Sequence, residues 1–469
     1  MRGQLLAVVA AAFGLRLVRA ALRWDEITLA YAAYLQPWQD HLRAGDLGGM
    51  LSTFVGLHPP LYPALFSAVD LAWGAPAGWL LMSVAASTLA VWVVGRAAGL
   101  AAAATLAVDP LQLAYCAEVN NYPLLVLIIA LCLAAERRAS DGRGWGPLAL
   151  AGVAGGWTHL LGGLAGGLFA LKLARRDLRA GLAVLGVMAA GTAPVVARGL
   201  ALAGGEGTYG QGGLDPAALA GGLHEKLGLW GLVWGLALVG GVRRPGLLAV
   251  AFALAAAILG MMGLGVAASH QQPYWLALGP LVAALVGAWR PLGLVAVGLG
   301  LWGFGPELDR LEALQRDLGR PRAIDAAIAA IPPGGALWLL APALMPDDDK
   351  RDTSDVLWRL EPFRPAPPWR GDGAPAFEFT DYRFGQPRWL AGRVVHTSTD
   401  LSTDAFDAAL GWHLAAGRPV GVVLYDHGPA FDYPGKVRRA LDPYDHRCVE
   451  VGADVGLGVD LLCVVEGLR

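Results

Sequence analysis

The residues of this 469-residue chain that are best suited to chemistry are acids, histidines and amides at the ends of long apolar segments. Asp25 and Glu26 directly follow the first apolar segment, and Glu118 lies in a short polar stretch between two others. A carboxylate held just above an apolar layer is partly desolvated, which raises its pKa and makes it a better general base. The plainer interpretation is that these acids are only hydrated at the membrane interface. The residue types alone favour the general base and the hydrated acids equally.

Further polar motifs occupy similar positions, and each has a plain structural explanation. His58 precedes a Pro-Pro pair, which usually marks a turn. The stretches 115–122 and 269–274 are short enough to do no more than cap neighbouring helices, and a lone histidine in a glycine-rich run is typical of a polar tip. The candidate residues from these motifs are His58, Asn120, Asn121, Tyr122, His159, His270, Gln271 and Gln272.

A metal ion is a second option for the acids. A hard cation such as Mg²⁺ or Mn²⁺ binds oxygen ligands, and Asp25, Glu26 and Glu118 could supply them. No ligand spacing enforces such a site, so we favour a site without metal and expect no certain cofactor.

The elements that position these residues are those of a membrane protein. Apolar residues make up 55% of the chain and charged residues 16%, against about 25% charged in a soluble domain. The net charge of −2 provides no basic field for nucleic acid, so binding of DNA or RNA is not expected.

The charge is divided unevenly along the chain. Residues 1–305 hold 31 charged side chains, and residues 306–469 hold 43 in about half the length. We therefore expect a multi-span membrane domain over 1–305 and a soluble domain over 306–469.

Apolar runs locate the spans, each of which needs about 20 residues. The run Gly146–Leu173 is too long for one span and has a polar, glycine-rich break at 155–159, so we interpret it as two. The other runs are Leu5–Ala21, Trp79–Val94, Ala98–Leu113, Tyr122–Ala135, Gly181–Leu202, Leu227–Val242, Leu247–Ala268, Trp275–Trp289 and Pro291–Gly303. The total is about eleven transmembrane helices.

Basic clusters orient these spans, because positive residues favour the cytoplasmic side. An even number of spans separates each cluster from the next, which predicts a cytoplasmic N-terminus and an extracytoplasmic second domain in the plasma (inner) membrane. Arg16, Arg19 and Arg23 at the outer end of the first span break the rule and either snorkel or face the bundle interior. The run Gly56–Gly74 would break the parity, so we expect an interfacial or re-entrant helix that starts after Pro59 and Pro60.

In this topology the histidines and key acids of residues 1–305 all lie on the outer face. A transporter would place polar groups near the middle of the membrane, where Asp109 is the one strong candidate. An enzyme that works at the outer surface would show the sorting predicted here.

The motifs in this order resemble the GT-C superfamily of membrane glycosyltransferases, in the branch of the protein O-mannosyltransferases and lipid A aminoarabinose transferases. The resemblance rests on Asp25-Glu26, on His58 to Tyr62, on Tyr115 to Tyr122, on Thr158-His159 and on Tyr274 to Pro280. It covers roughly residues 1–305 and is specific through order and spacing, since no single motif is specific.

The resemblance implies inverting transfer of a sugar from a polyprenyl-phosphate donor to a protein, lipid or glycan acceptor. Asp25 would be the general base, with Glu26 beside it, and Glu118 would position a substrate. His58, Tyr122 and His159 would line the cleft. The family has arginines where this chain has Asn120 or Asn121 and Gln271 or Gln272. Guanidinium groups are natural phosphate ligands, so another residue compensates, the donor differs or activity is reduced.

Residues 306–469 are expected to form a small α/β domain. The patterns predict helices over 307–331, 404–416 and 435–441, strands over 336–340, 420–425 and 459–465, and a long loop over 361–393. Cys448 and Cys463 could pair if the domain is extracytoplasmic. A transporter or flippase, or a non-catalytic assembly protein with this fold, remains the alternative to the enzyme.

Overall fold

The structure is a computed structural model, and its described residues form two compact units. The described residues between 2 and 303 belong to a helical unit and those between 323 and 468 to a sheet unit, so the predicted boundary near residue 305 lies outside the described residues. The described residues are 2–22, 41, 44–52, 59–73, 76–117, 120–203, 216–217, 219–221, 228–263, 272–303, 323–340, 388–390, 392–398, 404–424, 433–451 and 460–468.

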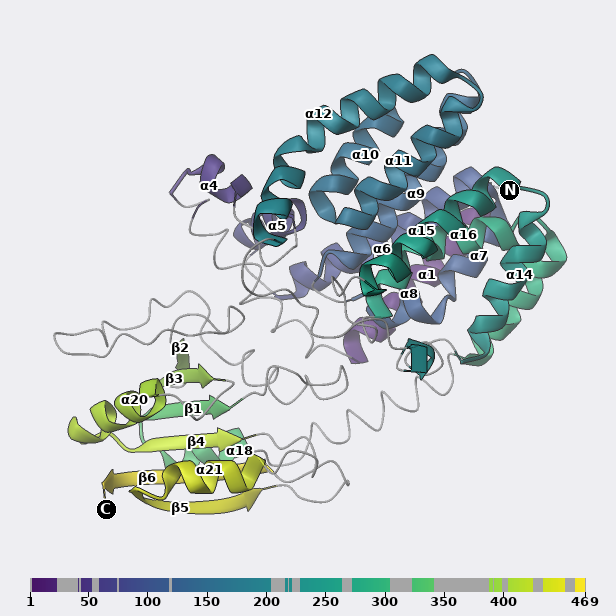
Figure 1. The fold of residues 1–469 in the computed structure, drawn as a ribbon. Coiled ribbons are helices and arrows are strands. Elements are labelled where there is room, and N and C mark those ends of the chain that lie inside the picture. The colour runs from purple at the N-terminus through teal and green to yellow at the C-terminus, as the bar shows by residue number, and fades with distance from the viewer. Residues whose placement is uncertain are drawn as a thin grey trace. The chain divides into compact units, whose positions relative to one another are not determined.

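The helical unit is built from apolar helices (Figure 1). Its α-helices are α1 (Arg2–Leu22), α4 (Leu47–Ser52), α5 (Leu61–Trp73), α6 (Pro76–Ala98), α7 (Leu100–Ala107), α8 (Pro110–Tyr115), α9 (Tyr122–Ser140), α10 (Gly146–Thr158), α11 (Leu160–Ala174), α12 (Leu178–Ala203), α14 (Gly231–Gly241), α15 (Pro245–Gly263) and α16 (Gly279–Val286). The 3₁₀ helices η2 (Gly228–Trp230) and η3 (Gln272–Leu278) and an apolar helix over Arg290–Gly303 complete it.

Four of the described helices are long and apolar enough to cross a membrane by themselves. They are Arg2–Ala20, Leu81–Ala98, Leu178–Arg198 and Pro245–Gly263. Shorter apolar helices accompany them, so the structure has the polytopic character that the composition predicts, while the total of eleven spans stays a prediction.

Two of the apolar runs are divided between separate helices. The run Gly146–Leu173 forms two helices, as predicted, because the chain leaves the helix at His159 (φ −164°, ψ 146°). The run Ala98–Leu113, predicted as one span, is wrong as a single helix. It ends at Ala107 and restarts as α8, because the Asp109 carboxylate caps the new helix and Pro110 occupies its first turn.

The glycines of the α10–α11 pair let the two helices touch through their backbones. A Cβ on Gly162 would lie 2.7 Å from the carbonyl oxygen of Gly155, and a Cβ on Gly155 would lie 2.6 Å from the backbone of Gly162. No side chain larger than hydrogen fits at this crossing. The break at His159 lies between these two glycines in sequence.

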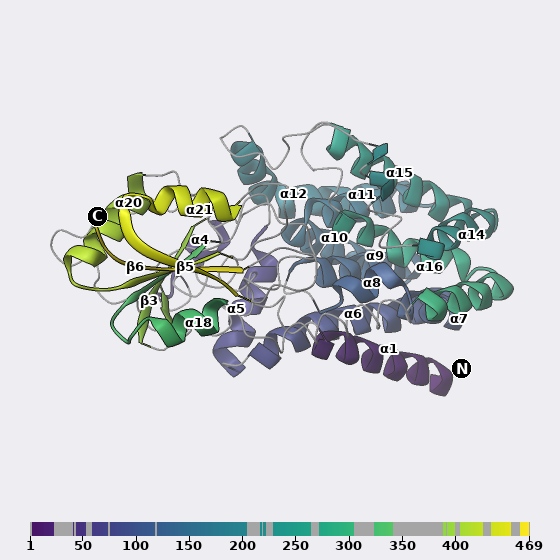
Figure 2. The same ribbon diagram turned by 90° about the horizontal axis from the view of Figure 1, so that it is seen from below.

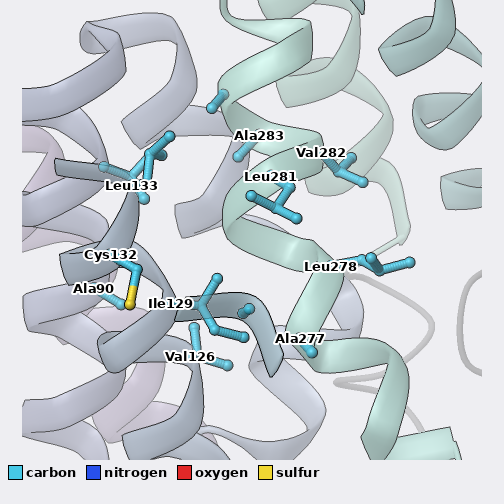
Figure 3. Close-up of a cluster of buried hydrophobic side chains, with 14 of the residues drawn as sticks. Ala90, Val126, Ile129, Cys132, Leu133, Ala277, Leu278, Leu281, Val282 and Ala283 are labelled. Atoms are coloured by element: carbon cyan, nitrogen blue, oxygen red, sulfur yellow. The ribbon is translucent and has the colours of Figure 1, made fainter. Parts of the chain in front are cut away.

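The core of the helical unit lies where α9 packs between α6 and α16. Val126, Ile129 and Leu133 follow helical spacing along one face of α9 and point toward α16 (Figure 3). Cys132 lies beside Ala90 of α6 and is a free, buried thiol, which confirms its prediction as a packing residue.

The basic segments of the helical unit gather at one end, which we call the basic end. Contacts there join the last turn of α6 to that of α9, the last turn of α11 to that of α9, and the α14–α15 connection to the residues after α16. The contacts are Arg137 Nη1 to the carbonyl oxygen of Ala97, Lys172 Nζ to Glu136 Oε2 (2.5 Å), and the Arg243 guanidinium 4.5 Å from the Trp289 ring centre. The side of the membrane that the basic end faces stays a prediction.

Arg16 and Arg19 face the bundle interior, one of the two alternatives for these residues. Arg16 is fully buried and donates to Ser87 Oγ (2.7 Å) and to the carbonyl oxygens of Leu106 and Ala107 at the end of α7. Arg19 donates to the carbonyl oxygen of Ala114 in α8. Guanidinium groups at helix C-termini satisfy carbonyls that lack partners there. Arg23 lies outside the described residues.

The sheet unit is an α/β/α sandwich. Its strands β1 (Ala336–Leu340), β2 (Arg388–Leu390), β3 (Arg393–Ser398), β4 (Val420–Leu424), β5 (Tyr444–Val451) and β6 (Asp460–Leu468) follow the order β2-β3-β1-β4-β6-β5. The inner strands β3, β1 and β4 are parallel, and the outer pairings are antiparallel. Helices α20 (Asp404–Ala415) and α21 (Tyr433–Leu441) cover one face, and α18 (Ala323–Ala330) covers the other (Figure 2).

Most predicted elements of the second domain match this sheet. The strands predicted over 336–340, 420–425 and 459–465 and the helices over 404–416 and 435–441 form, and the helix over 307–331 is described from Ala323 to Ala330. The loop over 361–393 is partly wrong, because β2 lies within it and pairs with β3. Strand β5 carries alternating exposed residues and was not predicted. Cys448 and Cys463 face each other across β5 and β6 and form a disulfide.

Candidate functional site

The predicted site residues divide into those that the structure describes and those that it does not. Asn120, Asn121, Tyr122 and His159 are described, and only the backbone of Gln272 is. The remaining candidates lie outside the described residues: Asp25, Glu26, His58, Glu118, His270 and Gln271. The described candidates are therefore the ones from which the site can be built.

Tyr122 and His159 come together with two tyrosines that were not singled out as site residues. Tyr122 begins α9, His159 lies between α10 and α11, and Tyr274 belongs to η3. The ring centres are 6.0 Å apart for Tyr122 and His159, 6.3 Å for Tyr122 and Tyr274, and 5.4 Å for His159 and Tyr274. Tyr115, the last residue of α8, packs edge-on against Tyr122 at 6.4 Å. We call these four residues the ring cluster.

The ring cluster lies at the opposite end of α9 from the basic end. Tyr122 and Arg137 are about four helical turns apart, which corresponds to roughly 22 Å. Glu118, Asn120 and Asn121 lie in sequence between Tyr115 and Tyr122 of the ring cluster. Three of the motifs that were expected to share a face meet at this end through described residues: Tyr115 and Tyr122, His159, and Tyr274.

His159 is held in one orientation by the start of α11. Its Nδ1 accepts a hydrogen bond from the backbone N–H of Leu161 at 3.1 Å, and the backbone N–H of His159 donates to the carbonyl oxygen of Gly155. Since Nδ1 is the acceptor, the proton of the neutral ring is on Nε2, which is then a hydrogen-bond donor. The ring is 6% exposed. His159 thus combines a helix cap with a ring that packs beside two tyrosines, Tyr122 and Tyr274.

Asn121 joins the segment before α9 to the same break. Its Nδ2 donates to the carbonyl oxygen of Thr158 at 3.1 Å, and the residue is fully buried. Asn120 is less buried, and its Oδ1 accepts from the N–H of Asn121. Asn121 therefore fixes the backbone beside His159, and Asn120 is the more accessible of the two amides.

A second hydrogen bond holds η3, and with it Tyr274, against α8. Gln112 Nε2 donates to the carbonyl oxygen of Leu276 at 3.1 Å, and the Gln112 N–H donates to the Asp109 carboxylate that caps α8. Asp109 is buried and close to the Arg16 guanidinium. Sequence reasoning placed Tyr115 and Tyr274 in motifs without assigning them to the site. Their aromatic type at the edges of polar stretches is the signal that could have found them.

No group of three metal-binding side chains occurs among the described residues. Asp25, Glu26 and Glu118 lie outside them, so the preference for a site without metal stays a prediction.

The chain was compared with known proteins. No protein-family model matches it, and no curated protein matches it. Its fold is similar to the crystal structure of ArnT from Cupriavidus metallidurans bound to undecaprenyl phosphate, with a TM-score of 0.55, 15% identity and coverage of 98% of each chain. The apo structure of the same protein gives a TM-score of 0.51 and 14% identity, over 96% of this chain and 98% of that one.

The similarity extends over both units of the chain and concerns the fold. ArnT is a lipid A aminoarabinose transferase of the GT-C class, the class that the sequence motifs resemble. The expected fold class is thus confirmed as the fold of a polytopic membrane protein.

Proposed function

We propose that this protein is a membrane glycosyltransferase that takes its sugar from a polyprenyl-phosphate donor and works in the plasma (inner) membrane. The observation that carries the proposal is the ring cluster, assembled from three GT-C-like motifs at one end of a bundle with the ArnT fold. The solved relative was crystallised with undecaprenyl phosphate, which supports a lipid-linked donor. The acceptor is a protein, a lipid or a glycan.

The reaction assigns a separate role to each group. Asp25 removes the proton from the acceptor hydroxyl as it attacks the anomeric carbon, with Glu26 beside it and Glu118 positioning a substrate. The leaving phosphate gains negative charge, so hydrogen-bond donors must face it. The Nε2–H of His159 and the amide of Asn120 are donors of the required kind, and His58, His270, Gln271 and Gln272 belong to the same proposed site. A single displacement inverts the anomeric centre.

The orientation follows from the basic end. If its arginines face the cytoplasm, the ring cluster faces the extracytoplasmic side, and the reaction takes place there. The disulfide of the sheet unit supports an extracytoplasmic position for the second domain, because disulfides persist in oxidising compartments.

The structure weakens the transporter alternative at its one strong residue. Asp109 accepts hydrogen bonds from the N–H groups of Leu111 and Gln112 as the N-cap of α8, which gives it a structural role. The non-catalytic alternative is still supported by the amides that stand at the positions of the two family arginines. The experiment below tests it.

The test is to reconstitute the purified protein with polyprenyl-phosphate sugars and to measure the polyprenyl phosphate released. We expect Asp25→Asn to abolish release, because the amide cannot accept the acceptor proton. Asp141→Asn, which removes an exposed acid after α9, is the matched control and should keep full activity. A fully active Asp25→Asn protein would refute the assigned base. Absence of donor binding by the wild type would favour the non-catalytic alternative.

A further inference from the structure

Two arginines from different segments lie at the basic end, where α6, α9 and α16 pack against one another. Arg137, in the last turn of α9, donates to the carbonyl oxygen of Ala97, near the end of α6. Arg244, in the connection between α14 and α15, donates to the carbonyl oxygen of Ala284 in α16 at 3.2 Å. Both guanidinium groups are thus held by hydrogen bonds to carbonyls of other helices, and these bonds restrict the movement of the long side chains.

The positive charges of this pair are not neutralised by the described residues. Neither arginine forms an ion pair there, and the nearby carboxylate of Glu136 is already held by Lys172 and by Ser140 Oγ (2.8 Å). Burial and, second, the charge of Arg137 lower the pKa of Arg244 below its usual value. The positive charges of the two arginines therefore act on the same region, and together they attract an anion.

Each guanidinium has donors to spare for such an anion. A guanidinium carries five N–H groups in a planar fork that matches the oxygens of a phosphate. One of them donates to a carbonyl oxygen in each arginine. Arg137 is exposed and Arg244 half-buried, so a ligand can reach both.

The surroundings of the pair indicate that the anion is carried by a lipid. The next residue, Arg243, lies over the ring of Trp289, and tryptophan is typical of the membrane interface. Apolar side chains beside these residues are open to the outside: Val242 is 79% exposed and Leu294 is 75% exposed. Such surfaces need acyl chains rather than water as neighbours.

We propose that Arg137 and Arg244 bind the phosphate of an anionic phospholipid at the basic end, with the Arg243–Trp289 pair beside the headgroup. This site is separate from the ring cluster and does not depend on the proposed transferase reaction. It joins the ends of α6, α9 and α16 and the α14–α15 connection through one phosphate.

The test measures lipid binding to the full-length protein in detergent by native mass spectrometry, with phosphatidylglycerol as the probe. We expect the double variant Arg137→Gln/Arg244→Gln to bind phosphatidylglycerol about tenfold or more weakly, since it loses charge-assisted hydrogen bonds from both sides. The control variant Arg138→Gln/Arg143→Gln removes the same charge from exposed positions near the end of α9 and should bind like the wild type. Equal losses in the two variants would show a general charge effect and overturn the proposal.

Two further arms separate the alternatives. Inorganic phosphate at millimolar concentration should not compete with phosphatidylglycerol, and full competition would identify a site for a soluble anion. Arg244→Lys keeps the charge without the fork, and we expect binding between that of the wild type and the double variant. If the double variant does not fold, Arg244→Lys decides alone, and its unchanged affinity would refute the phosphate fork.

Discussion

His159 has a structural role in the fold and, in the function that we propose, a chemical role as well. Its Nδ1 caps α11 through the N–H of Leu161, and this hydrogen bond places the ring proton on Nε2. Because the cap is a geometric requirement of the break, the donor is oriented before any substrate arrives. The sequence predicted His159 as a cleft residue but also allowed a satisfied polar tip. The structure shows the cap, and the role in a cleft stays a prediction.

The replacement His159→Asn separates the two roles. Asparagine is a good N-cap, so α11 and the melting temperature should change little. The ring contacts with Tyr122 and Tyr274 and the Nε2 donor are lost. We expect the kcat for sugar transfer to fall by about tenfold or more, as for the removal of a donor to a developing anion. Full activity with an unchanged melting temperature would show that His159 is only a cap.

At the scale of elements, breaks in helices rather than long helices build the site. His159 lies at the break between α10 and α11, and Asp109 lies at the break between α7 and α8. The glycine-rich break at 155–159 was predicted, because its length and polarity stand out in an apolar run. The break at Asp109 was missed, although Asp-Pro is a helix start signal, because an apolar run of span length obscured it.

The α10–α11 crossing offers a matched pair of glycines in one helix. Gly162→Ala places a methyl group 2.7 Å from the carbonyl oxygen of Gly155, whereas nothing lies within 4 Å of a Cβ at Gly167. We expect Gly162→Ala to destabilise the protein by about 1–3 kcal/mol through overpacking. Gly167→Ala should be neutral or stabilise it by about 0.5–1 kcal/mol through helix propensity. Thermal unfolding in detergent checks both values, and equal melting temperatures would contradict the backbone contact.

The cap at Asp109 can be divided into its geometric and its electrostatic part. Asp109→Asn keeps a good cap and removes the charge near Arg16, while Asp109→Ala removes both. We expect the alanine variant to be less stable than the asparagine variant by about 1 kcal/mol, the usual worth of an N-cap. Unfolding curves of the two variants under one condition give this difference. The same stability for both would mean that the cap contributes nothing.

At the scale of the whole molecule, a fold similar to ArnT is kept at 15% identity over almost the full chain. The low charge of residues 1–305, the recurring basic clusters and the order of a few motifs were enough to predict this fold class. The contacts between Tyr122, His159 and Tyr274 could not be read from sequence, because they depend on how three distant helix ends pack. The sheet unit was predicted where strands are continuously apolar, and β5 was missed because its outward residues are polar.

The membrane orientation can be tested through the two cysteines of the sheet unit. Cys448 and Cys463 are opposite each other on β5 and β6 and form a disulfide, whereas Cys116 and Cys132 are buried free thiols. If the sheet unit is extracytoplasmic, the disulfide forms in cells, because that compartment is oxidising while the cytosol keeps thiols reduced. In a Cys116→Ser/Cys132→Ser background, denatured cell extracts should therefore show no labelling by a maleimide polymer until a reductant is added, and two labels per chain afterwards. A Cys448→Ser control should take one label without reductant. Two labels before reduction would place the sheet unit in the reducing compartment. With the predicted number of spans, the basic end then could not face the cytoplasm. This result would contradict the proposed extracytoplasmic reaction.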